Sequence, residues 1–405
     1  MENKNLNDKI TLKNGSELKN RLFKSAMSEQ LGDKDHNPTS KLVKLYKAWG
    51  DGGIGVSISG NVMIDRTALG EPRNVVLDDK SDADKFRSWT KAGTSNNTHF
   101  WAQLNHPGKQ SPKFLSKSPV APSAVSLRGG LKNAFNTPRE LTEKEILEII
   151  KKFATSAKFA KEYGFTGVQI HSAHGYLVNQ FLSPHHNRRE DGWGGSFEKR
   201  TRFVVEIYKA MRKKVGNDFP VSIKLNSSDF RDGGFTIEEA IKIAEILDKE
   251  GIDLIEISGG SYENPNMMGK PGAEKEGYFI EYAAKIKEKI TAPLVLTGGF
   301  RSAKGMLSAL NSGATDMIGI ARPLAVETDF PSKVLNDIDY KIYLPHLSTG
   351  IKALDSMVMI GLTWYEYQMY RIGKGKKVNP KQNAWSSALQ TLWRVGVHAF
   401  KQRRA

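Results

Sequence analysis

Short apolar runs alternate along this chain with longer segments whose apolar residues recur every three or four positions. Runs of four to seven residues rich in Val, Ile and Leu are typical of buried strands, and the longer pattern is typical of amphipathic helices. The predicted strands are Arg21–Met27, Ile54–Ser59, His99–Leu104, Gly167–His171, Val221–Leu225, Leu254–Ser258, Leu294–Thr297 and Met317–Ile320.

Helical patterns lie between these strands. The predicted helices are Ser40–Gly50, Ser81–Thr94, Thr142–Tyr163, Phe197–Val215, Thr236–Glu250, Phe279–Ile290 and Ser302–Asn311. Thr142 and Glu145 form a capping-box pattern at the start of one of them. Alternating strands and helices imply a parallel sheet, and eight units predict an α/β fold closed as a (β/α)8 barrel. An open doubly wound sheet is the alternative, and it is disfavoured because no Gly-x-Gly-x-x-Gly follows the first strand.

Two segments of the predicted barrel fall outside the repeat. Ile10–Leu18 reads as a hairpin that turns at Asn14-Gly15, and we expect it to cap the barrel floor. Gly108–Pro138 is a long Ser, Pro and Gly-rich excursion after the third strand, and long ordered loops of this kind are often functional lids.

The C-terminal part, residues 346–405, is predicted to be a basic helical extension packed on a barrel formed by residues 1–345. A helix lying on a membrane surface or on a partner is the alternative. The predicted contact stripe consists of Leu389, Leu392, Trp393, Val397 and Phe400.

Composition narrows the class of protein. The 405 residues include no Cys, which excludes disulfides, thiolate-bound zinc, iron–sulfur clusters and a thiol nucleophile. The start of the chain has no apolar signal segment and no apolar run is long enough for a bilayer, so we expect a cytoplasmic protein without stable membrane insertion. The net charge is +16, but nine Lys or Arg lie between Arg371 and Ala405 without any Asp or Glu. No nucleic-acid-binding motif accompanies that tail, and no nucleic-acid partner is expected.

Polar residues gather where the predicted strands end, which is where catalytic groups of such barrels lie. They are Ala26-Met27-Ser28, Ser59-Gly60, Gln103–His106, His171 with His174 and Tyr176, Lys224 with Asn226, Ser258–Gly260, Gly298–Arg301 and Gly319–Arg322.

His171, His174 and Tyr176 are open to three readings. A metal pair needs further ligands that the motif does not contain, and a structural pair is the second reading. We favour two neutral donors that polarise a carbonyl or nitro oxygen, with Tyr176 as the proton donor to the substrate. No metal ligand is therefore assigned.

Other strand ends suggest a phosphate-bearing ligand. Gly298-Gly299 and Arg322 fit the common phosphate site of such barrels, although a tight turn alone would also use the glycines. Lys224 in an apolar strand needs a partner, which a reduced flavin would provide; a Schiff-base lysine of an aldolase is the alternative. The amide of Gln103 can meet a flavin edge with a donor and an acceptor, or it can be an ordinary interior amide.

Several motifs resemble one family. They are Leu18–Arg21 with Ser25-Ala26-Met27, Gln103–Gln110, Gly164–Leu177, Phe181–Pro184, Asn187–Asp191, Gly194–Ser196, Thr297–Arg301 and Ala321–Pro323, in order over roughly residues 5 to 335. Together they resemble the old yellow enzyme family of FMN-dependent NAD(P)H oxidoreductases, including its ene-reductases.

The resemblance implies a ping-pong cycle in which NADPH or NADH reduces FMN and the flavin then reduces an activated alkene or a quinone-like small molecule. It also implies that His171 and His174 bind the electron-withdrawing group and that Tyr176 donates the proton. The oligomeric state is left open, and a homo-oligomer is one of the arrangements considered. The implied FMN contacts are Ala26, Met27, Ser28, Gly60, Gln103, His171, Lys224, Gly299, Phe300, Ala321 and Arg322.

Two positions depart from the family pattern. Lys224 stands where most members have Arg, which replaces a forked contact by a point charge, and Ser28 stands where Thr or Cys is frequent. The competing hypotheses are a flavin-free barrel aldolase or isomerase and a binding protein that acts through its basic tail.

Overall fold

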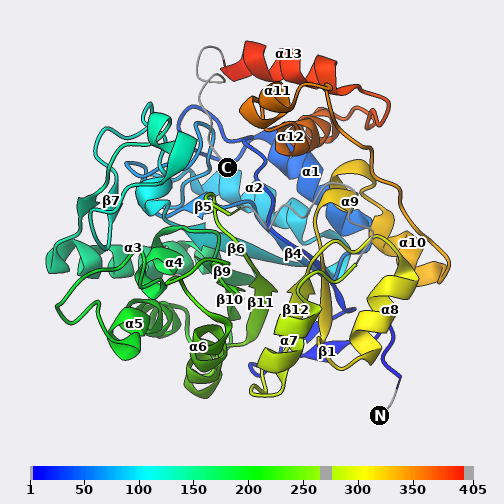
Figure 1. The fold of residues 1–405 in the computed structure, drawn as a ribbon. Coiled ribbons are helices and arrows are strands. Elements are labelled where there is room, and N and C mark those ends of the chain that lie inside the picture. Colours follow the sequence, from blue (N-terminus) through cyan, green and yellow to red (C-terminus); the bar gives the residue numbers. More distant parts are fainter. Residues whose placement is uncertain (1–2, 265–275, 396–405) are drawn as a thin grey trace.

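The computed structural model describes residues 3–264 and 276–395, and eight parallel strands in these ranges close into a barrel (Figure 1). Every barrel strand overlaps a predicted one. The second and third barrel strands along the chain pair with each other in parallel, and this pairing closes the ring. The barrel is therefore confirmed and the open doubly wound sheet is excluded. The strands are β3 (Leu22–Lys24), β4 (Val56–Ile58), β6 (His99–Asn105), β9 (Gly167–Ser172), β10 (Val221–Asn226), β11 (Leu254–Ser258), β12 (Leu294–Thr297) and β13 (Met317–Ile320).

Helices surround the barrel at the predicted places. They are α1 (Ser40–Asp51), α2 (Ala83–Gly93), α3 (Glu143–Glu162), α5 (Phe197–Val215), α6 (Ile237–Glu250), α7 (Ile280–Lys287) and α8 (Ala303–Asn311). The predicted capping box starts α3: the Glu145 N–H donates to Thr142 Oγ1 at 3.3 Å, and the Thr142 N–H donates to Glu145 Oε2 at 2.9 Å. Among the helices that the structure describes, none is long and apolar enough to cross a membrane.

The N-terminal hairpin closes the lower end of the barrel. Strands β1 (Ile10–Thr11) and β2 (Glu17–Leu18) pair antiparallel, and Gly15 in the turn has a φ of +84°. The hairpin side chains Ile10, Leu12 and Leu18 pack against the interior residues Phe23, Val56, Trp101, Leu254, Val295 and Met317. This contact confirms the predicted floor.

The excursion after β6 forms a cover over the opposite end. It contains the strand β7 (Val120–Ala121), which pairs with β8 (Arg139–Glu140), and a short β5 (Val62–Met63) pairs with the end of β6. Leu131 and Phe135 of the excursion form a buried cluster with Tyr176 and Tyr262. The cover therefore touches a tyrosine that the sequence predicts to be catalytic.

The C-terminal part continues through α9 (Arg322–Val326), α10 (Phe330–Asn336), α11 (Lys352–Met357), α12 (Ile360–Gly373) and α13 (Ala384–Val395). Helix α12 packs against α1 and α9, and α13 packs outside it, at the edge of the molecule shown in orange and red in Figure 1. The fully buried Trp364 of α12 donates its Nε1–H to the Gln382 carbonyl at 3.0 Å. Helix α12 of the extension therefore packs on helices of the barrel.

The predicted contact stripe of the extension is wrong at Leu389, whose side chain is 64% exposed. The buried face of α13 consists of Ala384, Ser387 and Ala388 instead. Small residues permit the close approach of α13, and Ser387 accepts a hydrogen bond from Gln382 Nε2 at 2.9 Å. The side chains of Leu392 and Trp393, and all of Val397 and Phe400, lie outside the described residues.

A buried histidine fixes the turn that leads from β6 into the cover. His106 is 3% exposed, and its Nδ1 accepts a hydrogen bond from the Gly108 N–H at 3.1 Å. Burial lowers the pKa of His106 to about 4. The folded state therefore holds the neutral ring, because protonation would both charge a buried group and remove the acceptor.

This histidine predicts an acid sensitivity of the fold. The pKa of His106 is lower when folded than the usual 6.5, so its contribution to stability is present above pH 6.5 and is lost as the pH falls towards 4. Between pH 7 and pH 4.5 the free energy of unfolding of the wild type is expected to fall by about 2 kcal/mol more than that of His106→Asn. Urea unfolding of both proteins at the two pH values measures the difference. Equal losses would contradict this account.

Candidate active site

A cavity of about 1060 Å³, including its open mouth, lies at the carboxyl end of the barrel strands. Ten of the thirteen predicted site residues line it: Ala26, Met27, Ser28, Gln103, His171, His174, Tyr176, Lys224, Ala321 and Arg322. They come from five different strands or the loops after them, as is typical of a barrel active site.

Gly60, Gly299 and Phe300 are not among the lining residues. The Gly60 N–H donates to Glu29 Oε1 at 3.1 Å and to the Tyr46 hydroxyl at 2.9 Å. Gly299 turns the chain with a φ of +80°, and Phe300 is buried in the core. The roles of these three in binding FMN stay predictions.

Lys224 has a protein partner that sequence reasoning did not identify. Its Nζ lies 3.0 Å from Glu256 Oε1, and Lys224 and Glu256 are direct neighbours on β10 and β11. Both side chains are almost completely buried, at 4% and 0% exposure. A Schiff-base role for Lys224 would require this buried ion pair to be broken, and the structure therefore disfavours it.

Glu256 also fixes the orientation of two interior amides. A carboxylate can only accept hydrogen bonds, so the Gln169 Nε2–H must donate to it, at 2.9 Å. The Gln169 Oε1 then faces Gln103, whose Nε2–H donates to it at 2.8 Å. The remaining Gln103 carbonyl oxygen is therefore an acceptor for a ligand in the cavity.

His171 is held as a neutral hydrogen-bond donor. Its Nδ1 accepts a hydrogen bond from the Ala173 N–H at 3.3 Å, so the ring proton is on Nε2. Burial, with a smaller effect of the nearby Lys224 charge, lowers the pKa of His171 well below its usual value. The ring packs edge-to-face against those of His174 and Tyr176, with centroid distances of 5.1 and 4.8 Å.

His174 and Tyr176 are positioned by the last residue of β11 and by the loop that follows it. His174 Nε2 lies 2.9 Å from Ser258 Oγ, and the Tyr176 hydroxyl lies 2.9 Å from the hydroxyl of Tyr262. His174 has a φ of +61°, a strained conformation for a residue other than glycine. Its N–H donates to Asn226 Oδ1 at 3.1 Å, which helps to hold this conformation.

Arg322 lines the cavity, and the charge of Arg301 lies close enough to act on it. Burial and the neighbouring charge of Arg301 lower the pKa of Arg322. Neither guanidinium forms an ion pair with a carboxylate in the described part of the chain, and Arg301 Nε is buried without a hydrogen-bond partner there. Two cations held together in this way fit a phosphate group.

The hydroxyl of Ser28, which lines the cavity, has a partner in the protein. It donates a hydrogen bond to the buried carboxylate of Glu71. The next residue, Glu29, is also buried, and burial raises its pKa to about 7 although Lys24 lies nearby. The loop after β3 is thus anchored by acidic side chains behind the cavity.

Sequence reasoning missed the side chains that complete the cavity from other segments. Tyr262 follows β11, and Leu362, Tyr365 and Met369 belong to α12. The spacing of the α12 residues by three and four positions is a helical face, but the sequence alone gives no sign that this face reaches a ligand site.

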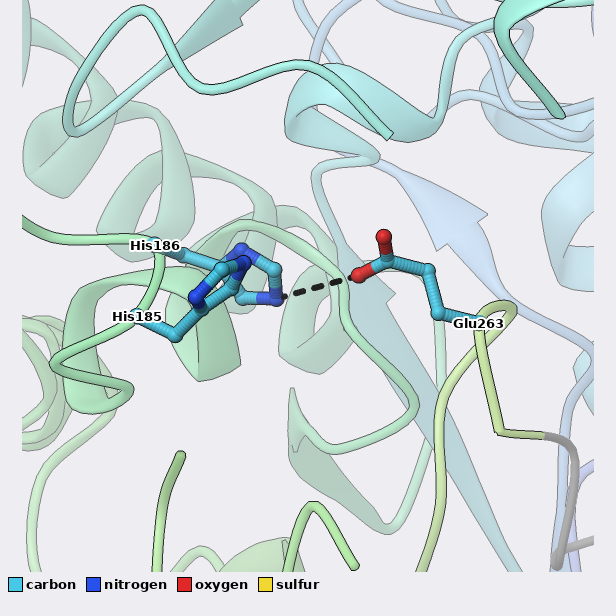
Figure 2. Close-up of side chains that lie close together, drawn as sticks. All are labelled: His185, His186 and Glu263. Atoms are coloured by element: carbon cyan, nitrogen blue, oxygen red, sulfur yellow. Dashed lines mark ion pairs between the residues drawn. The ribbon is translucent and has the colours of Figure 1, made fainter. Parts of the chain in front are cut away.

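In the described ranges, the group of His, Asp and Glu side chains whose ligand atoms lie close enough to share an ion consists of His185, His186 and Glu263 (Figure 2).

Comparison with known proteins shows what this chain is similar to. The sequence model of the NADH:flavin oxidoreductase / NADH oxidase family matches residues 5–340. The NADH-dependent flavin oxidoreductase iliE of Hypocrea jecorina is 37% identical over 384 residues, covering 85% of this chain and 95% of the relative. The NADPH dehydrogenase of Clostridium acetobutylicum is 31% identical, covering 76% and 88%. An old yellow enzyme homologue from Zymomonas mobilis has a similar structure, with a TM-score of 0.71, 25% identity and coverages of 84% and 95%.

The pair formed by Lys224 and Glu256 predicts a non-additive effect on stability. Glu256→Leu leaves a buried ammonium unpaired and is expected to lower the free energy of unfolding by about 3–5 kcal/mol. The double variant Lys224→Met with Glu256→Leu is expected to recover more than half of that loss, because the uncompensated charge is gone.

Chemical denaturation of the single and double variants measures this effect. Glu148→Leu on the exposed face of α3 is the matched control and should change stability little. A double variant no more stable than Glu256→Leu would show that the pair does not account for the loss.

Proposed function

The chain belongs to the NADH:flavin oxidoreductase / NADH oxidase family and is an FMN-dependent NAD(P)H oxidoreductase, and from this premise we propose that it reduces activated carbon–carbon double bonds. The proposed substrates are small α,β-unsaturated carbonyl or nitro compounds. One observation carries the proposal: His171, His174 and Tyr176 line the same cavity as Gln103, Lys224 and Arg322.

The cavity residues fit FMN. The acceptor oxygen of Gln103 and the ammonium of Lys224 suit the polar edge of the isoalloxazine ring, and Arg322 with Arg301 suits its phosphate. When bound there, FMN would supply the redox chemistry, the transfer of hydride from NAD(P)H to the second substrate. Lys224 would stabilise negative charge at the ring edge, and Glu256 would moderate that effect because it already neutralises part of the ammonium charge.

His171 and His174 would bind and orient the oxygen of the substrate. The Nε2–H of His171 is available as a donor because Nδ1 is held by the Ala173 N–H. A neutral donor in a buried site polarises a carbonyl or nitro group and draws electron density from the conjugated double bond. The β-carbon of that bond then becomes the position that accepts hydride.

Tyr176 would donate the proton to the α-carbon. The hydroxyl of Tyr176 is buried and lies 2.9 Å from that of Tyr262, which orients it and can stabilise the phenolate that proton donation leaves behind. The cover formed by Leu131 and Phe135 excludes water from both tyrosines.

Helix α12 would act as part of the cofactor site. Tyr365 lines the cavity, and its hydroxyl is close enough to Arg322 for each to influence the other's charge. On this proposal the extension of residues 346–405 and the barrel of residues 1–345 form one functional unit.

Tyr176→Phe separates the two half-reactions. We expect alkene reduction to slow by about 100-fold or more, the usual contribution of a positioned general acid, while reduction of the flavin by NAD(P)H stays within about twofold. Stopped-flow absorbance of the flavin measures both steps. Tyr262→Phe keeps the Tyr176 hydroxyl and should have the smaller effect. An equal loss in both half-reactions would contradict the proton-donor role.

Tyr365→Ala tests the contribution of α12 to cofactor binding. Loss of an aromatic contact is expected to weaken FMN binding by about tenfold. Titration of apoprotein with FMN, followed by the change in flavin fluorescence, gives the affinity. Tyr367→Ala changes a tyrosine of the same helix that does not line the cavity, and it should leave the affinity unchanged. Equal effects of the two substitutions would refute a direct role of Tyr365.

A further inference from the structure

Helix α13 is the outermost layer of the C-terminal part, at the edge of the molecule (Figure 1). Its buried face consists of the small residues Ala384, Ser387 and Ala388. Another face carries Trp385 and Leu389, whose side chains are 46% and 64% exposed. These two residues lie four positions apart, so they are neighbours on the helix surface. The helix therefore packs with small side chains and presents two large apolar ones to solvent.

Two exposed apolar side chains one turn apart are unusual in this protein. In the part of the chain that the structure describes, the other large apolar side chains that are exposed are Leu147 on α3 and, in loops, Ile338, Tyr343 and Ile351. Single exposed apolar residues are normal on a protein surface, whereas adjacent ones often mark an interaction site. The pair formed by Trp385 and Leu389 therefore points to a partner.

The orientation of α13 is imposed by buried amides beneath it. Gln382 Nε2 donates to Ser387 Oγ at 2.9 Å and to Gln390 Oε1 at 3.2 Å. The Gln382 carbonyl accepts the hydrogen bond from the buried Trp364 of α12 at 3.0 Å. Rotating α13 to bury Leu389 would move Ser387 out of reach of Gln382, so the exposed apolar face is a property of the docked helix.

The loop between α12 and α13 is strongly basic. It contains four exposed lysines: Lys374, Lys376, Lys377 and Lys381. The acidic residues of the extension are Asp355 and Glu366, and the sequence has none after Glu366. Asp355 accepts hydrogen bonds from Ser348 and Thr349, and Glu366 is buried and accepts from Gln30. The extension therefore supplies no free carboxylate to balance these lysines.

The basic loop is anchored on α12, although its lysine side chains are exposed. Gln368 Oε1 accepts a hydrogen bond from the Asn379 N–H at 2.8 Å. Arg371 Nε donates to the Lys377 carbonyl at 3.0 Å. The backbone of the loop and the apolar face of α13 are thus held in a fixed arrangement.

An apolar helix face beside exposed lysines matches the surface of an anionic lipid bilayer. Tryptophan and leucine side chains enter the boundary between headgroups and acyl chains, and flexible lysines reach the anionic headgroups. A second copy of this chain fits less well, because it would bring the same lysines against one another. Protein interfaces are also depleted in lysine, which is the exposed cation of this loop.

We propose that α13 and the basic loop before it form a docking surface for membranes that contain anionic phospholipids. The protein lies on the bilayer without spanning it, with Trp385 and Leu389 at the acyl-chain boundary. Helix α12 connects this surface to the active site, because Tyr365 and Met369 line the cavity and α13 packs against the same helix. Docking then brings the active site close to apolar molecules carried in the bilayer.

The experiment measures co-sedimentation of the FMN-loaded protein with lipid vesicles. The vesicles consist of phosphatidylcholine alone or with about 30% phosphatidylglycerol, which supplies the anionic surface. Two double variants test the surface: Trp385→Ser with Leu389→Ser, and Lys376→Glu with Lys377→Glu. Their matched controls lie on α3, away from α13 in Figure 1. These controls are Leu147→Ser and the double variant Lys144→Glu with Lys151→Glu, all at exposed positions.

We expect the wild type to sediment with anionic vesicles and not with neutral ones. The double lysine variant should weaken this binding by about 20-fold or more, because each charge at an anionic surface contributes about fivefold. The double apolar variant should weaken it by about tenfold or more through lost apolar burial. The α3 variants should stay within about threefold of the wild type, because their charges are screened over that distance.

FMN content and NAD(P)H oxidation in the absence of lipid should match the wild type in every variant, which shows that the fold is kept. Failure of the wild type to bind anionic vesicles would leave the surface to a protein partner and overturn the proposal. Equal binding to both kinds of vesicle, or an equal loss in the α3 variants, would also overturn it. So would a dimer in sedimentation velocity that only the double apolar variant loses, without vesicle binding, because the face would then belong to a second copy.

Discussion

The buried ion pair between Lys224 and Glu256 is the constraint on which the active site depends. It sets one charge at the end of β10, and through the acceptor chemistry of Glu256 it also fixes the amides of Gln169 and Gln103. Burying two charges in a barrel is costly unless every remaining hydrogen-bonding atom is satisfied. Thr297 contributes to this by donating to Glu256 Oε1 at 2.8 Å. The interior of the barrel thus presents a preorganised polar surface to the cofactor.

Segments that are distant in sequence together cover the site above this surface. The cover after β6 packs on Tyr176 and Tyr262, and α12 brings Tyr365 to the side of Arg322. The loop after β11 contributes Tyr262 to the cavity. A substrate oxygen and a flavin can then be held by different loops while the strands keep the reacting groups in register.

Burial sets the electrostatic properties of the side chains in the active site. His171 is kept neutral so that it acts as a donor instead of a cation, and its lowered pKa results mainly from desolvation. Arg322 and Arg301 keep positive charges without carboxylate partners in the described residues, and such a pair is stabilised when an anion binds. The charge of Lys224 is balanced locally, since its compact ammonium lies against one oxygen of Glu256.

The sequence by itself determined the barrel, the hairpin floor and most of the cavity. Strands and helices have periods that can be read locally, and strand ends meet at one face of a closed parallel barrel, so Gln103, His171, Lys224 and Arg322 could be grouped without coordinates. Only the tertiary structure decided which residues pair across strands and which distant helix reaches the cavity. Glu256 resembles any acidic residue in a strand until its register with Lys224 is known. Local periodicity predicted Leu389 as a contact residue, but its side chain is exposed. Which face of a helix is buried depends on the neighbour that it packs on, and local periodicity does not encode that neighbour.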